Sequence, residues 1–206
     1  VAVLRIEDDR GRILVQIGTA EPGDPTPTLK IELPGSKFID EETPEEAAKR
    51  IISSRVRFLQ GSVDHIRIDP VDEECHVSHR YKFFTKYLRT IVCMRVSGHV
   101  DAPSACYPAK CTSSSKHADV AEELRDRTVL LEQLDGKLFL YTWLYPGEKE
   151  KYADPSQAEM MRCWLESLEI DVPGFDAGDA QGSSSDSQHG FLSVIAVAPA
   201  RISHTW

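Results

Sequence analysis

The sequence predicts an α/β domain, because short apolar segments typical of β-strands alternate with two segments that have the start signals of helices. The apolar segments 1–6 and 12–17 are rich in Val, Ile and Leu and are separated by turn residues. The helical segments 44–56 and 155–168 each begin with a capping residue followed by proline. A chain of 206 residues is long enough for one domain with a hydrophobic core and a tail.

The composition indicates a globular chain that binds neither nucleic acid nor membranes. Hydrophobic residues make up 41% of the chain and charged residues 28%, which is ordinary for a soluble domain. The net charge of −9 opposes binding to a nucleic-acid backbone, which requires a basic surface. No apolar run approaches the ~20 residues that a membrane-spanning helix needs. The five cysteines are odd in number and irregularly spaced, which favours a reduced, cytoplasmic protein.

The remaining elements follow from local patterns. Gly and Asp in the connector 7–11 supply turn chemistry, so the first two apolar runs are expected to form a β-hairpin. Residues 29–33 alternate apolar and charged side chains, which is the period of a half-buried strand. Further apolar runs predict strands at 63–68, 89–96 and 137–144. The pattern at 73–86 is ambiguous, 101–116 is expected to be a surface excursion, and 119–127 is expected to form a short helix.

The first helix has an unusually clear start. Thr43 and Glu46 have the spacing of a capping box, and Pro44 stands at the first helical position, where its missing N–H costs nothing. The apolar residues that follow recur at helical spacing and form one stripe, made of Ala47, Ala48, Ile51 and Ile52. We expect this stripe to pack against the sheet, so solvent exposure of the two isoleucines would contradict the assignment.

The second helix begins with similar chemistry. Asp154 can cap the helix, Pro155 opens the first turn, and Gln157 can reach back towards the cap. Its apolar face contains Ala158, Met161, Trp164, Leu165 and Leu168. We expect Trp164 and Leu165 to cover the face of the sheet opposite the first helix.

The end of the chain has a different composition. Residues 173–190 are rich in Gly, Ser, Asp and Gln and are expected to form a flexible linker. Residues 191–206 form a C-terminal segment with an apolar part at 191–198. That part either returns to the domain as an edge strand or begins another part of the protein, and the pattern does not decide between the two.

The stretch from Gly35 to Arg50 resembles the first half of the signature of Nudix hydrolases. Gly35 matches the opening glycine of that signature, Glu42 its first glutamate and Arg50 its arginine. The resemblance covers residues 1–172 and implies an α/β/α sandwich, in which helices flank a mixed β-sheet. In that family, glutamates on the helix hold divalent cations that activate water against a diphosphate.

The second half of the signature is lost. The two metal-binding glutamates of the family fall on Ser54 and Arg55. The glutamate after the arginine is Ile51 here, and the glycine is Arg57. Mg²⁺ requires oxygen ligands, and an arginine at a ligand position places positive charge where the cation would lie. The resemblance therefore implies a domain without catalytic residues and without a metal cofactor.

Basic residues are the candidates for ligand binding. Arg55 and Arg57 can bind phosphate by charge and forked geometry if they face the former substrate cleft; alternatively, they only complement the helix C-terminus. A basic and aromatic cluster at 76–89 is either an anion site or a set of core and loop-anchoring residues. The candidate ligand-binding residues are Arg50, Arg55, Arg57, Arg80 and Lys82.

We expect a catalytically inactive Nudix-like domain that senses a ligand or binds a protein, as part of a larger intracellular protein. The degenerate Nudix domains of some ion channels bind ADP-ribose, so by analogy the ligand is a nucleotide derivative such as ADP-ribose. The expected partners are another protein or other domains of the parent chain.

Two alternatives remain open. A divergent metal-dependent hydrolase of nucleoside diphosphate derivatives would bind Mg²⁺ through other carboxylates, chosen among Glu41, Glu42, Glu45, Glu46, Glu73 and Glu74. A structural or oligomerising domain is the third possibility, suggested by the apolar segment 191–198.

Overall fold

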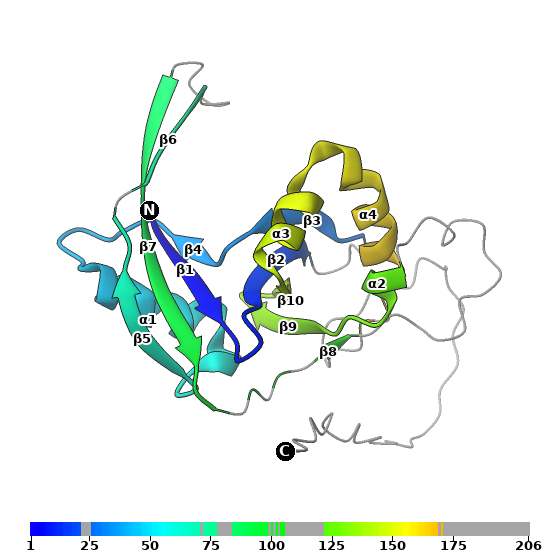
Figure 1. Ribbon diagram of the computed structural model, residues 1–206, viewed down its shortest axis with the longest axis horizontal. Coiled ribbons are helices and arrows are strands. Elements are labelled where there is room, and N and C mark those ends of the chain that lie inside the picture. The colour runs from blue at the N-terminus through cyan, green and yellow to red at the C-terminus, as the bar shows by residue number, and fades with distance from the viewer. Residues whose placement is uncertain are drawn as a thin grey trace, which may run out of the picture.

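The computed structural model describes residues 1–21, 26–70, 72–77, 84–98, 100, 102, 104–105, 122–168 and 170 of the chain. These residues form a mixed α/β structure in which several helices pack on a curled, mixed β-sheet (Figure 1). The predicted linker 173–190 and the C-terminal segment 191–206 lie outside the described residues, so what we expect of them remains a prediction.

The described strands belong to one sheet with the order β5-β7-β1-β2-β10-β9-β8. Three further strands pair beside this path: β3 with β2, β4 with β1, and β6 with β7. The pairing of β1 with β7 is parallel and the other pairings are antiparallel. The strands are β1 (Ala2–Glu7), β2 (Ile13–Ala20), β3 (Thr28–Glu32), β4 (Gly35–Ser36), β5 (Val63–Ile68), β6 (Asp72–Val77), β7 (Phe84–Val96), β8 (Ser104–Ala105), β9 (Val129–Leu134) and β10 (Lys137–Leu144).

The sheet curls because its first hairpin opens away from the turn. β1 and β2 are in register at Glu7 and Ile13, and from there the two strands diverge (Figure 1). The chain from β3 to β4 pairs first with β2 and then with β1, and the Leu4 amide donates to the Pro34 carbonyl at 2.8 Å. The segment that leads into the first helix is therefore held by both diverging strands.

The first helix, α1 (Pro44–Arg55), begins with the capping box that the sequence predicts. The Glu46 amide donates to the Thr43 hydroxyl oxygen at 3.3 Å, and the Thr43 amide donates to the Glu46 carboxylate at 2.9 Å. Such a cap contributes about 1 kcal/mol to stability. A short 3₁₀ helix, η1 (Arg57–Leu59), follows and leads to β5.

The other described helices lie late in the chain. They are α2 (Glu122–Arg125), α3 (Pro146–Ala153), the 3₁₀ turn η3 (Pro155–Gln157) and α4 (Ala158–Glu166). The prediction of one helix over 155–168 is wrong in its first turn, which is 3₁₀. There the Asp154 carboxylate accepts the Ser156 amide at 2.8 Å, and α-helical geometry begins at Ala158. None of the helices in the described ranges is long and apolar enough to cross a lipid bilayer.

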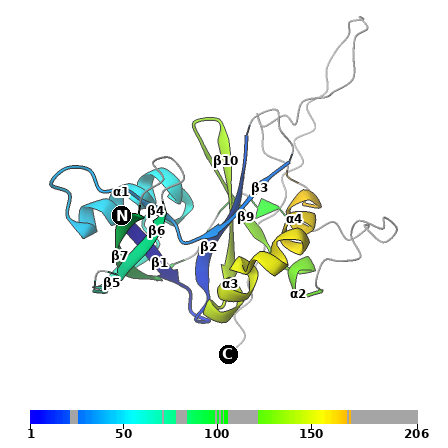
Figure 2. The same ribbon diagram turned by 90° about the horizontal axis from the view of Figure 1, so that it is seen from above.

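Two hydrophobic cores lie on opposite faces of the sheet, because successive residues of a strand point to opposite sides. On β2, Ile13 and Val15 belong to the core that contains Trp164 and Leu165 of α4. Leu14, between them, belongs to the core that contains the α1 stripe. Figure 2 shows α1 on one side of the sheet and the pair α3 and α4 on the other.

The packing expected for the two helices is confirmed. Ala47 and Ile51 have no exposed surface, and Ala48 and Ile52 are 3% and 7% exposed. Trp164 has no exposed surface and Leu165 is 1% exposed. The strands predicted at 63–68 and 137–144 match β5 and β10. The ambiguous stretch 73–86 lies partly in β6 and partly at the start of β7, where only the backbone is described. Neither β9 nor α3 was predicted.

Truncation of Ile51 tests the packing of α1. Because this side chain has no exposed surface, Ile51→Ala should lower the free energy of unfolding by about 2–5 kcal/mol, through lost burial and the remaining cavity. Lys49→Ala, at an exposed position of the same helix, should change it by less than about 0.5 kcal/mol. Urea denaturation measures both, and equal effects would contradict the packing described.

Candidate functional site

Arg50 is held by the loop that precedes its own helix. Its guanidinium makes a two-pronged ion pair with Glu42, with Nε 2.7 Å from Oε1 and Nη2 2.8 Å from Oε2. It also donates to the Ser36 hydroxyl at 3.2 Å and to the Lys37 carbonyl at 2.9 Å. Glu42 in turn accepts the Ile39 amide at 3.0 Å. The hydrogen bonds from Arg50, followed by the one from Ile39, lower the pKa of Glu42 to about 2.

This network fixes the loop that leads into α1, and it includes Glu42 and Arg50, two of the three residues that match the Nudix signature. Gly35 lies in β4, where its backbone approaches β1 so closely that an added Cβ would stand 2.9 Å from the Ala2 carbonyl oxygen. Glycine is therefore required at this position by the pairing of β4 with β1. Arg50 and Glu42 use their hydrogen-bonding groups on each other and on the loop, which fixes the position of both side chains.

Ser54 and Arg55 occupy the last turn of α1 and differ in their surroundings. The Ser54 hydroxyl donates to the Arg50 carbonyl at 2.7 Å, within the helix. The guanidinium carbon of Arg55 lies 5.6 Å from the centre of the Phe139 ring, at cation–π distance. Arg55 is half-buried and forms no ion pair with a carboxylate in the described ranges. Its charge is therefore not engaged in an ion pair among the described residues.

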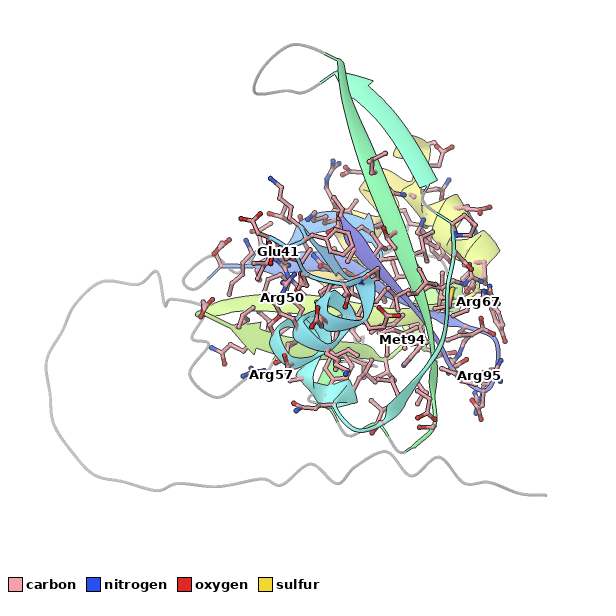
Figure 3. The ribbon with its side chains drawn as sticks, turned by 90° about the vertical axis from the view of Figure 1, so that its left-hand side faces the viewer. Glu41, Arg50, Arg57, Arg67, Met94 and Arg95 are labelled. Atoms are coloured by element: carbon pink, nitrogen blue, oxygen red, sulfur yellow. The ribbon has the colours of Figure 1, made fainter. Side chains whose placement is uncertain are left out.

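Arg57 fastens the end of α1 to the β9–β10 hairpin. Its Nε lies 2.7 Å from Oε1 of Glu132, and Nη2 donates to the Gln133 carbonyl. Glu132 is buried, with 6% of its surface exposed, whereas half of the Arg57 side chain is exposed. Figure 3 shows Arg50 and Arg57 on the same flank of α1. If Arg57 moved away, the buried carboxylate of Glu132 would be left without a cation, which is costly. The ion pair therefore holds Arg57 in place.

A row of polar side chains crosses the sheet beside Arg55. Tyr141 on β10 is in register with Gln16 on β2, and Gln16 is in register with Glu32 on β3. The Tyr141 hydroxyl donates to the Arg55 carbonyl at 3.0 Å. Burial is the main cause that raises the pKa of Tyr141, so the phenol stays protonated and keeps this donor.

Gln16 supplies the amide of this row, and this amide is not among the buried side-chain atoms without a hydrogen-bond partner, which in the described ranges are Arg127 Nε and Trp164 Nε1. The residue is 2% exposed, and its side chain forms no hydrogen bond with another described residue. The small exposed part of Gln16 therefore includes its amide, which is open to solvent and to a bound molecule. We call the group formed by Gln16, Glu32, Arg55, Phe139 and Tyr141 the Arg55 face.

The structure divides the predicted ligand-binding residues. Of these residues, Arg55 lies on the Arg55 face, while Arg50 and Arg57 are bound to Glu42 and Glu132. Arg80 and Lys82 lie outside the described residues, so their role stays a prediction. Gln16 and Tyr141 were not predicted, although Gln16 is a polar residue inside the apolar run of β2 and was a visible signal.

The acidic residues considered as alternative metal ligands make different contacts in the structure. Glu42 binds Arg50, Glu46 closes the capping box, and Glu41 and Glu45 are exposed. The backbone of Glu41 has a positive φ of 62°. The described ranges contain no group of three or more His, Cys, Asp or Glu side chains placed to hold a metal ion. Glu42 and Glu46 therefore already have partners within the described structure, and a Mg²⁺ site among these acids stays an untested alternative.

No model of a known protein family matches this chain, and a search of curated proteins finds no significant match.

The ion pair between Glu42 and Arg50 predicts a specific dependence of stability on pH. The pKa of Glu42 is lowered from 4.5 to about 2 on folding, so the pair stabilises the native state fully above pH 4.5. This stabilisation is lost as the pH falls from 4.5 towards 2. The difference in unfolding free energy between the native chain and Glu42→Gln should therefore be constant near neutral pH and shrink in that acidic range.

Urea denaturation across this range measures the difference. Glu159→Gln removes a carboxylate whose side chain is 82% exposed and serves as the matched control. If the Glu42→Gln difference stayed constant down to about pH 3, the ion pair would not be a source of native stability.

Proposed function

We propose that this chain is a non-hydrolytic binding module with a Nudix-like fold. In this proposal, the Arg55 face binds a phosphate-bearing nucleotide derivative such as ADP-ribose without a divalent cation. The single observation behind the proposal is Arg55 itself: an arginine without an ion pair in the described ranges stands where the resemblance places a metal-binding glutamate. A bound ligand would regulate the parent protein or its partner, because no chemistry is assigned to the site.

The charge of Arg55 opposes the metal that hydrolysis would need. Two unit charges of the same sign at 4 Å repel by about 4 kcal/mol at an effective dielectric constant of 20, and Mg²⁺ carries two charges. Ser54 does not offset this repulsion, because its hydroxyl hydrogen is used on the Arg50 carbonyl and the residue carries no charge. The same positive charge favours a phosphate directly.

The groups around Arg55 can bind a phosphate and also form hydrogen bonds with a polar group attached to it. A guanidinium presents forked donors that match two phosphate oxygens. The Tyr141 hydroxyl donates to the Arg55 carbonyl and so fixes the backbone at the end of α1, from which the Arg55 guanidinium extends. The Gln16 amide, which reaches solvent, supplies one more donor and one acceptor for hydrogen bonding. These features support binding and leave the identity of the base or sugar open to experiment.

The divergent hydrolase is the less supported alternative. Glu42 and Glu46 are engaged in stabilising contacts at the start of α1, away from Ser54 and Arg55 at its end. The side chains of Glu73 and Glu74 lie outside the described part of the structure. The alternative therefore remains a question for an activity assay.

Calorimetric titration with ADP-ribose tests the proposal. Affinity should be the same in Mg²⁺ and in EDTA, because Arg55 and not a cation neutralises the phosphates. A hydrogen bond to a charged group is worth about 1.5–3 kcal/mol, so Arg55→Ala should weaken binding roughly 10- to 100-fold. Arg162→Ala, which removes an exposed arginine of α4, is the control and should leave the affinity unchanged.

Two results would overturn the proposal. Unchanged affinity in Arg55→Ala would show that the ligand does not bind at the Arg55 face. Affinity that requires Mg²⁺ would contradict binding without a metal ion. A panel of nucleoside diphosphate derivatives with Mg²⁺ and Mn²⁺ addresses catalysis separately. Turnover that disappears in Glu42→Gln would show that the chain is an enzyme.

A further inference from the structure

A groove runs along the flank of α1 opposite Arg50 and Arg57. It has a volume of about 480 Å³, which is the size of a site that accepts a small molecule or two side chains. Figure 3 shows Met94 of β7 on this side of the helix. The residues that line the groove come from α1, from the turn before β5 and from β5 and β7; they are Glu45, Ala48, Lys49, Ile52, Ser53, Gln60, Gly61, Val63 and Met94.

The floor of the groove is apolar and its upper rim is polar. Ala48, Ile52 and Met94 form part of the core beneath α1, and Val63 packs against that core. Gly61 has a φ of +80°, and a Cβ built on it would meet nothing within 4 Å, so the turn leaves this end of the groove open. An apolar side chain that enters here would lose water without leaving a polar group unsatisfied.

The groove borders the edge strand β5. Among the described residues, β5 pairs with β7 on one side and with no strand on the other. The Ser97 amide donates to the Ser62 carbonyl, and the Asp69 amide donates to the Ile91 carbonyl. In an antiparallel pair the direction of these bonds alternates, so the backbone groups of Val63, His65 and Ile68 point to the unpaired side.

A helix flank beside an unpaired strand edge is an arrangement that accepts an extended segment as an added strand. Main-chain hydrogen bonds would form with the outward groups of β5, and alternate side chains of the added strand would enter the groove. Ile68, at the far end of β5, is 37% exposed and would gain cover from such a strand. An uncovered edge of this kind is also a site of unwanted pairing between chains.

We propose that the occupant is the segment 191–198 of this same chain, added to β5 with side chains in the groove beside α1. Its sequence, Phe-Leu-Ser-Val-Ile-Ala-Val-Ala, contains no charge and is rich in residues that favour strands. Either set of alternating side chains is largely apolar, so either face can enter an apolar groove. Left uncovered, a segment of this composition would promote aggregation.

The length of the chain permits this docking. The twenty residues 171–190 separate the described part from the segment and span up to about 65 Å when extended. A domain of about 170 residues has a radius of gyration of roughly 16 Å, so the segment reaches any edge of the sheet. A tether of this kind gives an effective concentration in the millimolar range, which favours docking within one chain over docking between two copies.

Residue-resolved amide hydrogen exchange tests this proposal on the full 206-residue chain. The amides of Val63, His65 and Ile68 point away from β7, so they would exchange rapidly if the β5 edge were uncovered. Under the proposal they exchange at least about 100-fold more slowly than that, because the added strand accepts them. A chain that ends at residue 188 should lose this protection and keep the protection of the inward-pointing Asp64 and Asp69 amides.

Two sets of variants separate docking from a general loss of structure. Ser53→Phe fills the groove from an exposed position of α1 and should remove the protection in the full chain, whereas Glu159→Phe adds the same ring on α4 and should not. Val194→Asp with Ile195→Asp places a charge on both faces of the segment and should act as the truncation does.

Three outcomes would overturn the proposal. The first is rapid exchange of the three amides in the full chain. The second is slow exchange that persists after truncation at residue 188. The third is protection that disappears on dilution, which would assign the occupant to a second copy of the chain.

Discussion

The burial of one apolar stripe on α1 determines where the other groups of interest lie. The stripe of Ala47, Ala48, Ile51 and Ile52 packs against the sheet and fixes the rotation of the helix about its axis. Because side chains follow a helix at 3.6 residues per turn, this rotation assigns every other residue of α1 to a flank. Arg50 then faces β4, and Glu45, Lys49 and Ser53 face β5. Arg57, in η1 just after the helix, pairs with Glu132 of β9.

The two flanks differ in how fully they are used. On the first flank, ion pairs with Glu42 and Glu132 join α1 to its preceding loop and to the β9–β10 hairpin. Arg55, at the end of the helix, has a guanidinium that forms no ion pair with a described carboxylate. On the second flank, an apolar groove lies beside an edge strand. The two surfaces proposed to bind a ligand and an added strand therefore lie on different flanks of α1.

Features that depend on neighbours in the chain could be predicted from the sequence, whereas features that depend on strand order could not. The capping box at Thr43 and the buried stripe of α1 are local features, and both were predicted. The row of Gln16, Tyr141 and Glu32 requires knowledge that β2 lies between β10 and β3, which no local pattern contains. The pairing of Arg57 with Glu132 joins residues 75 positions apart, so no local pattern could predict that the Glu132 carboxylate is buried.

A titration with Mn²⁺, followed by the widths of backbone amide NMR lines, tests most directly the claim that the last turn of α1 has lost its cation site. A paramagnetic ion bound there would broaden the amides of Ser54 and Arg55 selectively and saturably. The charge of Arg55 predicts instead that these amides broaden no more than those around Arg162 on α4. Selective, saturable broadening at Ser54 and Arg55 would contradict the account, because it would place a divalent cation beside the guanidinium that is proposed to replace it.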